Sequence, residues 1–338
     1  MTCRSCQSEK LVDILSLGDQ YLSDFIDPGD AKPPSYPLDL VLCRECSLLQ
    51  LKHTTPVSEM YNDRYGYRSG INATMQYELN EIVIEASKRV DLKPEDVVVD
   101  IGANDGTLLT NYEGVQRIAI EPIKKFAKEI EKNKRAEIVI NDFFSLASYR
   151  KHCMKRAKII TAISMFYDLG DPNTFVGDLV KILHYEGVIV IQQNYLGSMI
   201  QNMALDNIVH EHVEYYSLSS LEKLLNRHGL EVVDVQMSSI NGGSFRTFIK
   251  HMDNIKKLRI IERTLRLDKQ GTYLLFGMKA QQAVRKLHEF IKKEVELGKK
   301  VYVLGASTRG NTLLQAARLD HTLITAAIER NPEKYGKL

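Results

Sequence analysis

The 338-residue sequence has no tryptophan, almost no net charge and no long apolar run. Its 45 basic and 43 acidic residues leave a net charge of +2, so the chain as a whole has no strong attraction to nucleic acid. An enzyme that acts on RNA needs a basic strip with aromatic side chains that stack on bases, and the missing tryptophan weakens that possibility further. The composition therefore disfavours a nucleic-acid partner.

Signals for membranes and secretion are missing as well. No apolar run approaches the roughly 20 residues that a transmembrane helix needs, and the N-terminus lacks the apolar segment of a signal peptide. With 44% hydrophobic and 26% charged residues, the composition is ordinary for a globular protein with a sizeable core. The sequence predicts a cytoplasmic protein with no membrane partner.

Cysteine is scarce, and four of the five cysteines form two pairs, Cys3 with Cys6 and Cys43 with Cys46. In a reducing compartment such C-x-x-C pairs favour tetrahedral zinc over disulfides, with four unligated thiols as the alternative. Four thiolates leave no open position on the metal, so the zinc is predicted to be structural. Residues 1–60 are therefore predicted to form a zinc-binding module, because so small a piece has too thin a core without the metal.

The rest of the chain alternates between strand and helix patterns, which predicts a parallel, doubly wound α/β sheet. A later pair of strands, Val232–Met237 and Phe245–Lys250, brackets a glycine turn and is predicted to close the sheet as a hairpin. A helical stretch from 255 to 298 precedes a second strand, glycine turn and helix at 300–314, which predicts a further small α/β domain. The strands predicted for the main sheet are 97–100, 117–121, 137–140, 159–163 and 188–192, with a helix over 173–183 before the last.

A glycine loop follows the first of these strands. Gly102 and Gly106 are spaced G-x-x-x-G, which differs from the G-x-G-x-x-G of a dinucleotide pyrophosphate site. Glycine lets the backbone turn sharply and approach a ligand closely. Asp100 at the start of the loop would repel a phosphate, so the loop suits a cationic or hydroxyl-bearing ligand.

Acidic residues end the first three strands: Asp100, Glu121 and Asp142. A carboxylate after the second strand of such a sheet commonly accepts hydrogen bonds from ribose hydroxyls. Together with Asn104 of the glycine loop, the three acids indicate a ligand with a cation, a ribose and an adenine. That describes S-adenosylmethionine better than NAD, while helix caps and solvated strand ends are the alternative interpretation.

Acid/base groups gather in one short segment, His210-Glu211-His212, followed by Tyr215 and Tyr216. This concentration favours proton transfer, although a surface loop with idle histidines is the alternative. His-x-His can also bind a metal, but the H-E-x-x-H spacing is absent. A tyrosine-rich stretch, 61–67, precedes the helix predicted over 71–90 and is interpreted either as a ligand-facing lid or as a solvated linker.

Each of two further glycine turns has an arginine close by in the sequence. Gly243 and Arg246 belong to the hairpin turn, and a forked guanidinium suits a phosphate or a carbonyl. Gly305, with Arg309 and Asn311, opens a helix whose N-terminus would attract a diphosphate. A plain hairpin turn and a plain strand-to-helix turn are the alternative interpretations.

Taken together, these motifs resemble those of the nucleotide-sugar C-methyltransferases that act on 4-keto-6-deoxy hexoses, typified by the tetronitrose and mycarose C-3 enzymes. The resemblance extends over nearly the whole chain. It is carried by the two cysteine pairs with Tyr36-Pro37-Leu38 before the second, Tyr67…Ser69…Thr74-Met75, Asp100–Gly106, Glu211-His212…Tyr216-Ser217, Gly242-Gly243-Ser244 with Arg246, and Gly310–Leu314.

The resemblance implies a class I S-adenosylmethionine methyltransferase domain of Rossmann-like fold over 61–252, between the zinc module and a C-terminal α/β substrate domain over 253–338. The implied substrate is a dTDP- or GDP-linked 4-keto-6-deoxyhexose methylated at C3. His212 would be the general base, with Glu211, a lid tyrosine (Tyr67, or alternatively Tyr65) and Tyr216 in the catalytic cluster. The expected substrate-binding residues are His210, Gly243, Arg246, Gly305, Arg309 and Asn311.

This sequence departs from the family pattern in two places near the expected active site. Val209 stands where the family often has tyrosine, and the loop after the fourth strand has no histidine, so enolate stabilisation is expected from Tyr167 or Tyr216. The chain also stops shortly after Asn331-Pro332, where the family usually continues, which suggests a truncated C-terminus. A zinc-containing RNA methyltransferase and a non-catalytic sugar-nucleotide-binding module are the rival functions, and a monomer or weak dimer is expected.

Overall fold

A computed structural model describes residues 1–22, 29, 31–61, 65–305 and 308–328. The chain divides into two compact units, 1–253 and 254–338, which are described separately. Single-turn 3-10 helices occur at Ser69–Ile71, Leu108–Asn111, Phe166–Asp168, Leu205–Asn207 and Ile240–Gly242.

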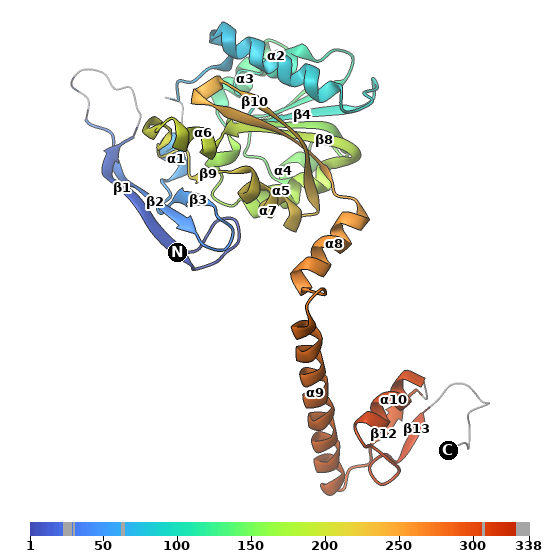
Figure 1. The fold of residues 1–338 in the computed structure, drawn as a ribbon. Helices are drawn as coiled ribbons and strands as arrows, with labels where there is room; N and C mark the ends of the chain where they lie inside the picture. Colours follow the sequence, from blue (N-terminus) through green and yellow to red (C-terminus); the bar gives the residue numbers. More distant parts are fainter. Residues whose placement is uncertain (23–28, 30, 62–64, 306–307, 329–338) are drawn as a thin grey trace. The chain divides into compact units, whose positions relative to one another are not determined.

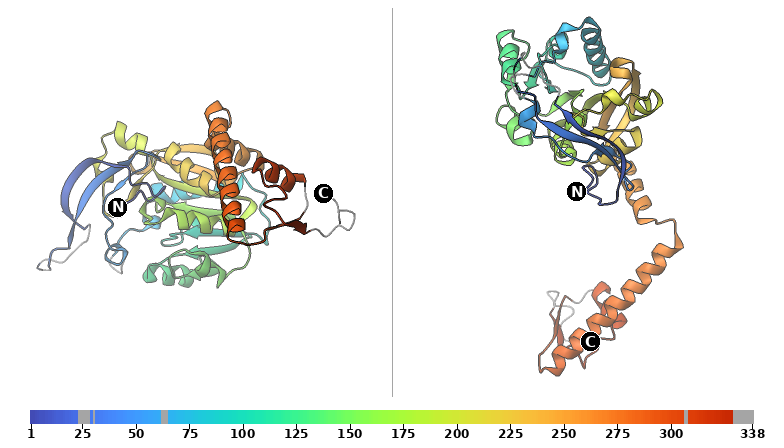
Figure 2. Two further views of the ribbon diagram at one scale, coloured as in Figure 1. Left: turned by 90° about the horizontal axis from the view of Figure 1, so that it is seen from below. Right: turned by 90° about the vertical axis from the view of Figure 1, so that its left-hand side faces the viewer.

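The first unit begins with a small antiparallel sheet. Its strands are β1 (Leu11–Tyr21), β2 (Ser35–Cys43) and β3 (Leu49–Leu51), and β1 and β2 lie side by side along most of their length (Figures 1 and 2). The fourth strand, β9 (Glu214–Tyr215), comes from more than 150 residues further along the chain and pairs with β3. A short helix, α1 (Val57–Met60), leads out of this sheet.

The main sheet has seven strands. Five parallel strands form one side of it, and β11 and β10 add an antiparallel hairpin next to β8, as the sequence predicts. The α/β fold is therefore confirmed, although the sheet is mixed rather than parallel throughout. Its spatial order is β10 (Leu230–Ser238), β11 (Ser244–His251), β8 (Leu183–Asn194), β7 (Ala157–Ile163), β4 (Val97–Ile101), β5 (Gln116–Ile120) and β6 (Ile138–Ile140).

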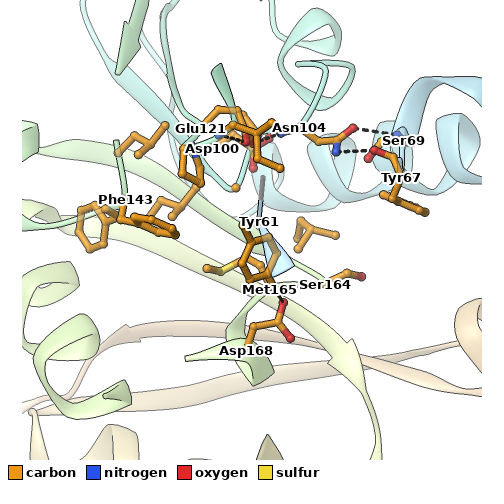
Figure 3. Close-up of a pocket in the computed structure, with 18 of the residues that line it drawn as sticks. Tyr61, Tyr67, Ser69, Asp100, Asn104, Glu121, Phe143, Ser164, Met165 and Asp168 are labelled. Carbon is orange, nitrogen blue, oxygen red and sulfur yellow. Dashed lines mark hydrogen bonds between the residues drawn. The ribbon is translucent and has the colours of Figure 1, made fainter. Parts of the chain in front are cut away.

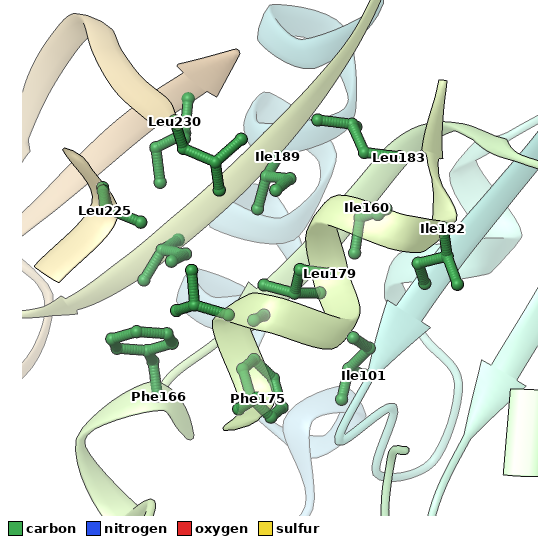
Figure 4. Packing of buried hydrophobic residues seen from close by; sticks show 14 of the residues in the cluster. Ile101, Ile160, Phe166, Phe175, Leu179, Ile182, Leu183, Ile189, Leu225 and Leu230 are labelled. Atoms are coloured by element: carbon green, nitrogen blue, oxygen red, sulfur yellow. The ribbon is translucent and has the colours of Figure 1, made fainter. Parts of the chain in front are cut away.

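Helices cover both faces of this sheet, which explains why its central strands are apolar without alternation. On β4, Val97, Val99 and Ile101 face a core that includes α5 (Pro172–Ile182) and α7 (Leu218–Arg227) (Figure 4). Val98 faces the opposite core, which includes α2 (Ala73–Ser87) and residues of α3 (Lys124–Lys132). The remaining helices of this unit are α4 (Leu146–Arg150) and α6 (Leu196–Gln201).

The N-terminal cysteine module packs on helices α5 and α7 of the same unit. Besides the β3–β9 pairing, the Asn173 side chain donates hydrogen bonds to the carbonyl oxygens of Arg4 and Ser5 at 2.9 and 2.8 Å. Arg227 of α7 donates to the same Ser5 carbonyl at 2.5 Å. The segment that carries His210-Glu211-His212 is thereby held against the N-terminal sheet.

The second unit contains the predicted helical stretch and the second strand–turn–helix. Its elements are α8 (Asn254–Leu265), α9 (Gln270–Glu296), β12 (Tyr302–Leu304), α10 (Thr308–Ala316) and β13 (Ala326–Ile328), and β12 pairs with β13 in parallel. Gly305 has a positive φ of 89°, and its N–H donates to the Ile328 carbonyl at 2.7 Å. Of the helices described in either unit, none has an apolar stretch long enough to cross a bilayer.

Candidate active site

Two cavities lie at the carboxyl ends of the parallel strands and share part of their walls. The first has a volume of about 500 Å³ and is lined by the loops after β4, β5, β6 and β7. The second, of about 850 Å³, is lined by five residues of one segment and by residues of three others. They are Asp206, Asn207, Val209, Glu211 and His212, with Glu59, Asn194 and Asn241. Residues common to both walls are Tyr61, Tyr65, Tyr67, Ser164 and Asp168.

Two buried carboxyl groups lie in the first cavity (Figure 3). Glu121 accepts hydrogen bonds from the backbone N–H groups of Asn104 at 2.7 Å and Ile123 at 2.8 Å, and Asp100 accepts one from the Thr161 hydroxyl at 2.6 Å. Burial raises the pKa of both groups to about 7. A cation or a hydroxyl donor placed here would therefore meet carboxylates that lack compensating positive charge.

The glycine loop shapes the same cavity and holds the tyrosine segment. Gly102 has a φ of 72°, and a Cβ there would lie 3.1 Å from the Met165 side chain, so only glycine fits without a shift. The Asn104 amide donates to the Tyr67 carbonyl at 3.0 Å and accepts from the Ser69 N–H at 3.0 Å. Asn104 thereby ties the tyrosine segment to the sheet, and Tyr67 lines both cavities.

Two of the residues expected to bind the cofactor lie away from the cavity. Gly106 packs instead against α3, where a Cβ would come within 3.0 Å of Ile130. Asp142 is exposed, and its side chain accepts a hydrogen bond from the Phe143 N–H at 2.8 Å. Phe143 and Phe144, which follow it, line the cavity and supply the apolar wall that a flat base requires. Two consecutive aromatic residues after a strand end were the signal that the sequence reasoning missed.

His212 faces the second cavity with a defined tautomer. Its Nδ1 lies 3.0 Å from the Asn207 carbonyl oxygen, and because a carbonyl only accepts, Nδ1 carries the proton and Nε2 is left with a lone pair. Burial lowers the pKa of His212 to about 4, so the ring is neutral at physiological pH. The Tyr167 ring packs on it with a centroid separation of 4.2 Å. A neutral imidazole with a free Nε2 can accept a proton.

Three predicted site residues form hydrogen bonds away from the cavities, so their assignment to the site is corrected. Tyr216 is 1% exposed and donates to Glu214 at 2.9 Å in the core, so it does not reach either cavity. His210 points away from its neighbours in the segment and donates to the Tyr36 carbonyl of the N-terminal sheet at 3.1 Å. Both roles were inferred from sequence proximity, but adjacent side chains point in different directions.

Arg246 is the third, and it stabilises the fold. Its guanidinium donates to Gln192 at 2.8 Å, Gln236 at 3.2 Å and Glu78 at 3.0 Å, linking β8, β10 and α2. The residue is 5% exposed and has no donor directed at a cavity. Gly243, with a φ of 117°, accepts the Tyr195 N–H in the hairpin turn and lines neither cavity.

The remaining predicted substrate residues, Gly305, Arg309 and Asn311, belong to the second unit. Gly305 forms the turn after β12, and the side chains of Arg309 and Asn311 lie outside the described part of the chain. Glu211, in contrast, lines the second cavity beside His212.

The four paired cysteines converge at one point. Their sulfur atoms all lie within 4.8 Å of one another, with Cys3 and Cys46 at 3.4 Å and Cys6 and Cys43 at 3.5 Å. Four thiolates bound to one tetrahedral zinc at about 2.3 Å have sulfur atoms about 3.8 Å apart, so the cluster fits a single ion with no open position.

Family comparison covers three successive parts of the chain. A zinc binding domain model matches residues 3–61, a methyltransferase domain model matches 71–235, and a C-methyltransferase C-terminal domain model matches 239–338. A curated relative, C-methyltransferase NovU of Streptomyces niveus, is 26% identical over 351 residues, which cover 99% of this chain and 83% of the relative. The three models together span nearly the whole chain, which is therefore similar throughout to S-adenosylmethionine-dependent C-methyltransferases.

Solved methyltransferase structures match about half of this chain, at lower sequence identity. The plantazolicin methyltransferase BamL is 13% identical, with a TM-score of 0.43, over 54% of this chain and 87% of its own. The magnesium protoporphyrin IX methyltransferase ChlM of Synechocystis is 12% identical, with a TM-score of 0.43, over 56% of this chain and 91% of its own.

The C-methyltransferase uses S-adenosylmethionine and carries a zinc-binding cysteine cluster, as its sequence predicts. The first cavity fits the cofactor on chemical grounds. Asp100 and Glu121 offer acceptors for hydroxyls and for positive charge, Gly102 allows close approach, and Phe143 and Phe144 provide an apolar wall. When bound, S-adenosylmethionine supplies an electrophilic methyl group on a positively charged sulfur.

Affinity of the C-methyltransferase for S-adenosylmethionine is expected to fall as the pH drops below 7. In the free protein the pKa values of Asp100 and Glu121 are about 7, and a cationic ligand with ribose hydroxyls favours the ionised carboxylates. Binding at lower pH must therefore release protons, and each such group weakens binding by about tenfold per pH unit. Titration calorimetry at pH 8 and pH 5.5 measures the change.

The matched control for this pH dependence is Asp142→Asn, because Asp142 follows the third strand but lies outside the cavity. It should keep both the affinity and its pH dependence, whereas Glu121→Gln should weaken binding and flatten the profile. An affinity of the unaltered protein that is equal at pH 8 and pH 5.5 would contradict the assignment of these carboxylates.

Proposed function

We propose that this C-methyltransferase methylates C3 of a nucleotide-linked 4-keto-6-deoxy sugar, with His212 as the general base. The supporting observation is the geometry of His212. Its Nδ1 donates a hydrogen bond to the Asn207 carbonyl, which leaves Nε2 available. His212 lines a cavity that shares five residues with the proposed cofactor cavity. A base on one side and a methyl donor on the other is the arrangement that alkylation of a carbon acid requires.

The chemistry follows from the acidity of a carbon beside a ketone. The ketone at C4 lets His212 Nε2 take the C3 proton, while the electrons of the C–H bond move toward the carbonyl oxygen as an enolate. C3 then forms its bond to the transferred methyl carbon. Glu211 lines the same wall beside His212 and is the acidic side chain that we assign to stabilise the imidazolium that results.

The wall of the second cavity suits a hydroxyl-rich ligand. It offers side-chain oxygens and amides from Glu59, Asn194, Asp206, Asn207 and Asn241. Carboxylates and amides of this kind hydrogen-bond to sugar hydroxyls in both directions.

The diphosphate of such a substrate needs positive charge that this wall does not supply. Among the described residues that line either cavity there is no lysine or arginine. The sequence has 18 basic and 8 acidic residues over 254–338, against 27 basic and 35 acidic residues over 1–253. The C-terminal unit is therefore the basic part of the chain.

The test is turnover with a panel of dTDP- and GDP-linked 4-keto-6-deoxyhexoses, followed by mass spectrometry. The expected product gains one methyl group, and a substrate deuterated at C3 loses its label. Methylation without loss of the C3 deuterium would place the reaction at another carbon. A methylated tRNA or rRNA, formed with an activity that falls steeply with salt, would favour the RNA methyltransferase instead.

A further inference from the structure

Asp168 lies at the junction of the two cavities. It is the last residue of the single turn Phe166–Asp168 after β7, and it is one of the residues that line both walls. Figure 3 shows it beside Tyr61, on the side of the first cavity opposite Asp100 and Glu121. A ligand in the second cavity that extends toward the cofactor must pass this side chain.

Only half of the Asp168 carboxyl group is satisfied. Oδ2 accepts a hydrogen bond from the Tyr61 hydroxyl at 2.7 Å. Oδ1 is buried and has no hydrogen-bond partner among the described residues. A buried polar atom without a partner costs about 1–3 kcal/mol, and in a binding cavity it marks a position that a ligand atom completes.

The surroundings of this carboxyl group favour its neutral form. Burial is the main cause that raises the pKa of Asp168 well above its usual range, and the nearby carboxylates of Glu211 and Glu214 add to it. Tyr61, Tyr65, Tyr167 and Tyr215 are the other titratable groups that interact with it, and none of them brings positive charge. The Tyr61 hydroxyl already donates to Oδ2, so the acid proton belongs on Oδ1.

We propose that Asp168 donates a hydrogen bond from Oδ1 to the ketone oxygen of the substrate and stabilises the enolate, with Tyr61 as the positioning residue. The proposal rests on the function proposed above and gives the enolate a partner other than Tyr167 or Tyr216. Tyr216 is in the core, and the Tyr167 ring packs on His212.

The proton balance of this step is simple. His212 Nε2 gains the C3 proton, the C3–C4 bond gains double-bond character, and the oxygen at C4 carries the negative charge. The Oδ1 proton stays on Asp168 and shortens its hydrogen bond to that oxygen as charge develops. As C3 bonds to the methyl carbon, the bond from that carbon to the donor sulfur would break with its electron pair staying on sulfur. The ketone reforms, and the proton on His212 leaves to solvent.

The test compares Asp168→Ala with Asp168→Asn, because asparagine keeps an acceptor for Tyr61 and an N–H donor at the Oδ1 position. The readouts are kcat for methylation and the rate of C3 deuterium exchange in D₂O with S-adenosylhomocysteine bound, which isolates enolate formation. Loss of one such donor costs about 10²–10³-fold, so alanine should lower both rates by that factor. Asparagine should retain at least about a tenth of both rates, and Tyr61→Phe should fall between the two.

Two results would overturn the proposal. An alanine variant with undiminished exchange would show that Asp168 does not meet the enolate, and an asparagine variant as slow as alanine would show that a carboxylate is required. Because Asp168→Asn is nearly isosteric, its melting temperature controls for folding. If the unaltered protein neither methylates nor exchanges C3 of any sugar in the panel, the proposed function fails first, which separates the two failures.

Discussion

Replacement of His212 by alanine is expected to abolish methyl transfer and C3 deuterium exchange while leaving binding of S-adenosylmethionine nearly intact. A general base contributes about 10²–10⁴-fold, and no other described histidine lines the second cavity. The cofactor cavity does not include His212, so its affinity should change by less than about threefold. Single-turnover kinetics and calorimetry measure the two quantities.

The chain provides a matched control two residues away. His210 has the same side chain but donates to the Tyr36 carbonyl and lines neither cavity. His210→Ala should lower stability by about 1 kcal/mol, because it leaves the partly buried Tyr36 carbonyl without this donor, and it should preserve exchange in the protein that remains folded. Exchange that survives in the His212 variant but not in the His210 variant would reverse the assignment.

The pH dependence of the same step has a defined direction. Since burial lowers the pKa of His212 to about 4, the neutral base is present throughout the neutral range. The acid limb of kcat/KM that belongs to this group should therefore lie near pH 4 instead of near the ordinary histidine value of about 6.5.

Loss of zinc is the second change with a large expected effect. Structural zinc contributes about 10–16 kcal/mol to the folding of small zinc domains, and the four cysteines are the ligands that hold the N-terminal module together. Cys46→Ser, or treatment with a strong chelator, should therefore unfold the module. Because β3 of the module pairs with β9, the segment that carries His212 should lose its support, and methyl transfer should fall below detection.

Zinc content by atomic absorption, protease sensitivity of residues 1–60 and turnover should change together. Cys153→Ser is the matched control, because Cys153 is buried but lies outside the cysteine cluster, and it should leave zinc content unchanged. Cofactor affinity should fall less than turnover, since most of the first cavity is built from the main sheet. A zinc-free protein with full turnover would show that the module is not needed for the reaction.

The sequence predicted most of the fold because its signals were local. The run Val97–Asp100 matches β4, and the helix expected over 173–183 matches α5 at Pro172–Ile182. The paired cysteines also identified their metal chemistry, since C-x-x-C spacing brings two thiolates to one ion within a single turn. The hairpin at the sheet edge was predicted from two strands around a glycine turn.

The sequence was less able to assign roles within a site, because the direction of a side chain and its distant partner decide its role. His210 and His212 look equivalent in the sequence, yet one supports the N-terminal sheet and the other faces a cavity. Arg246 was expected to bind a phosphate or a carbonyl, but Glu78, 168 residues away, holds it in the core.

The sequence by itself determined that this protein is an α/β methyltransferase with a cysteine-bound zinc, because strand patterns, a glycine loop and C-x-x-C pairs are local features. Only the tertiary structure decided which groups meet at the two cavities. Tyr61 and Asp168 are 107 residues apart, and their hydrogen bond exists because the segment after α1 lies against the loop after β7. Such a contact depends on how two elements pack, and no local pattern encodes it.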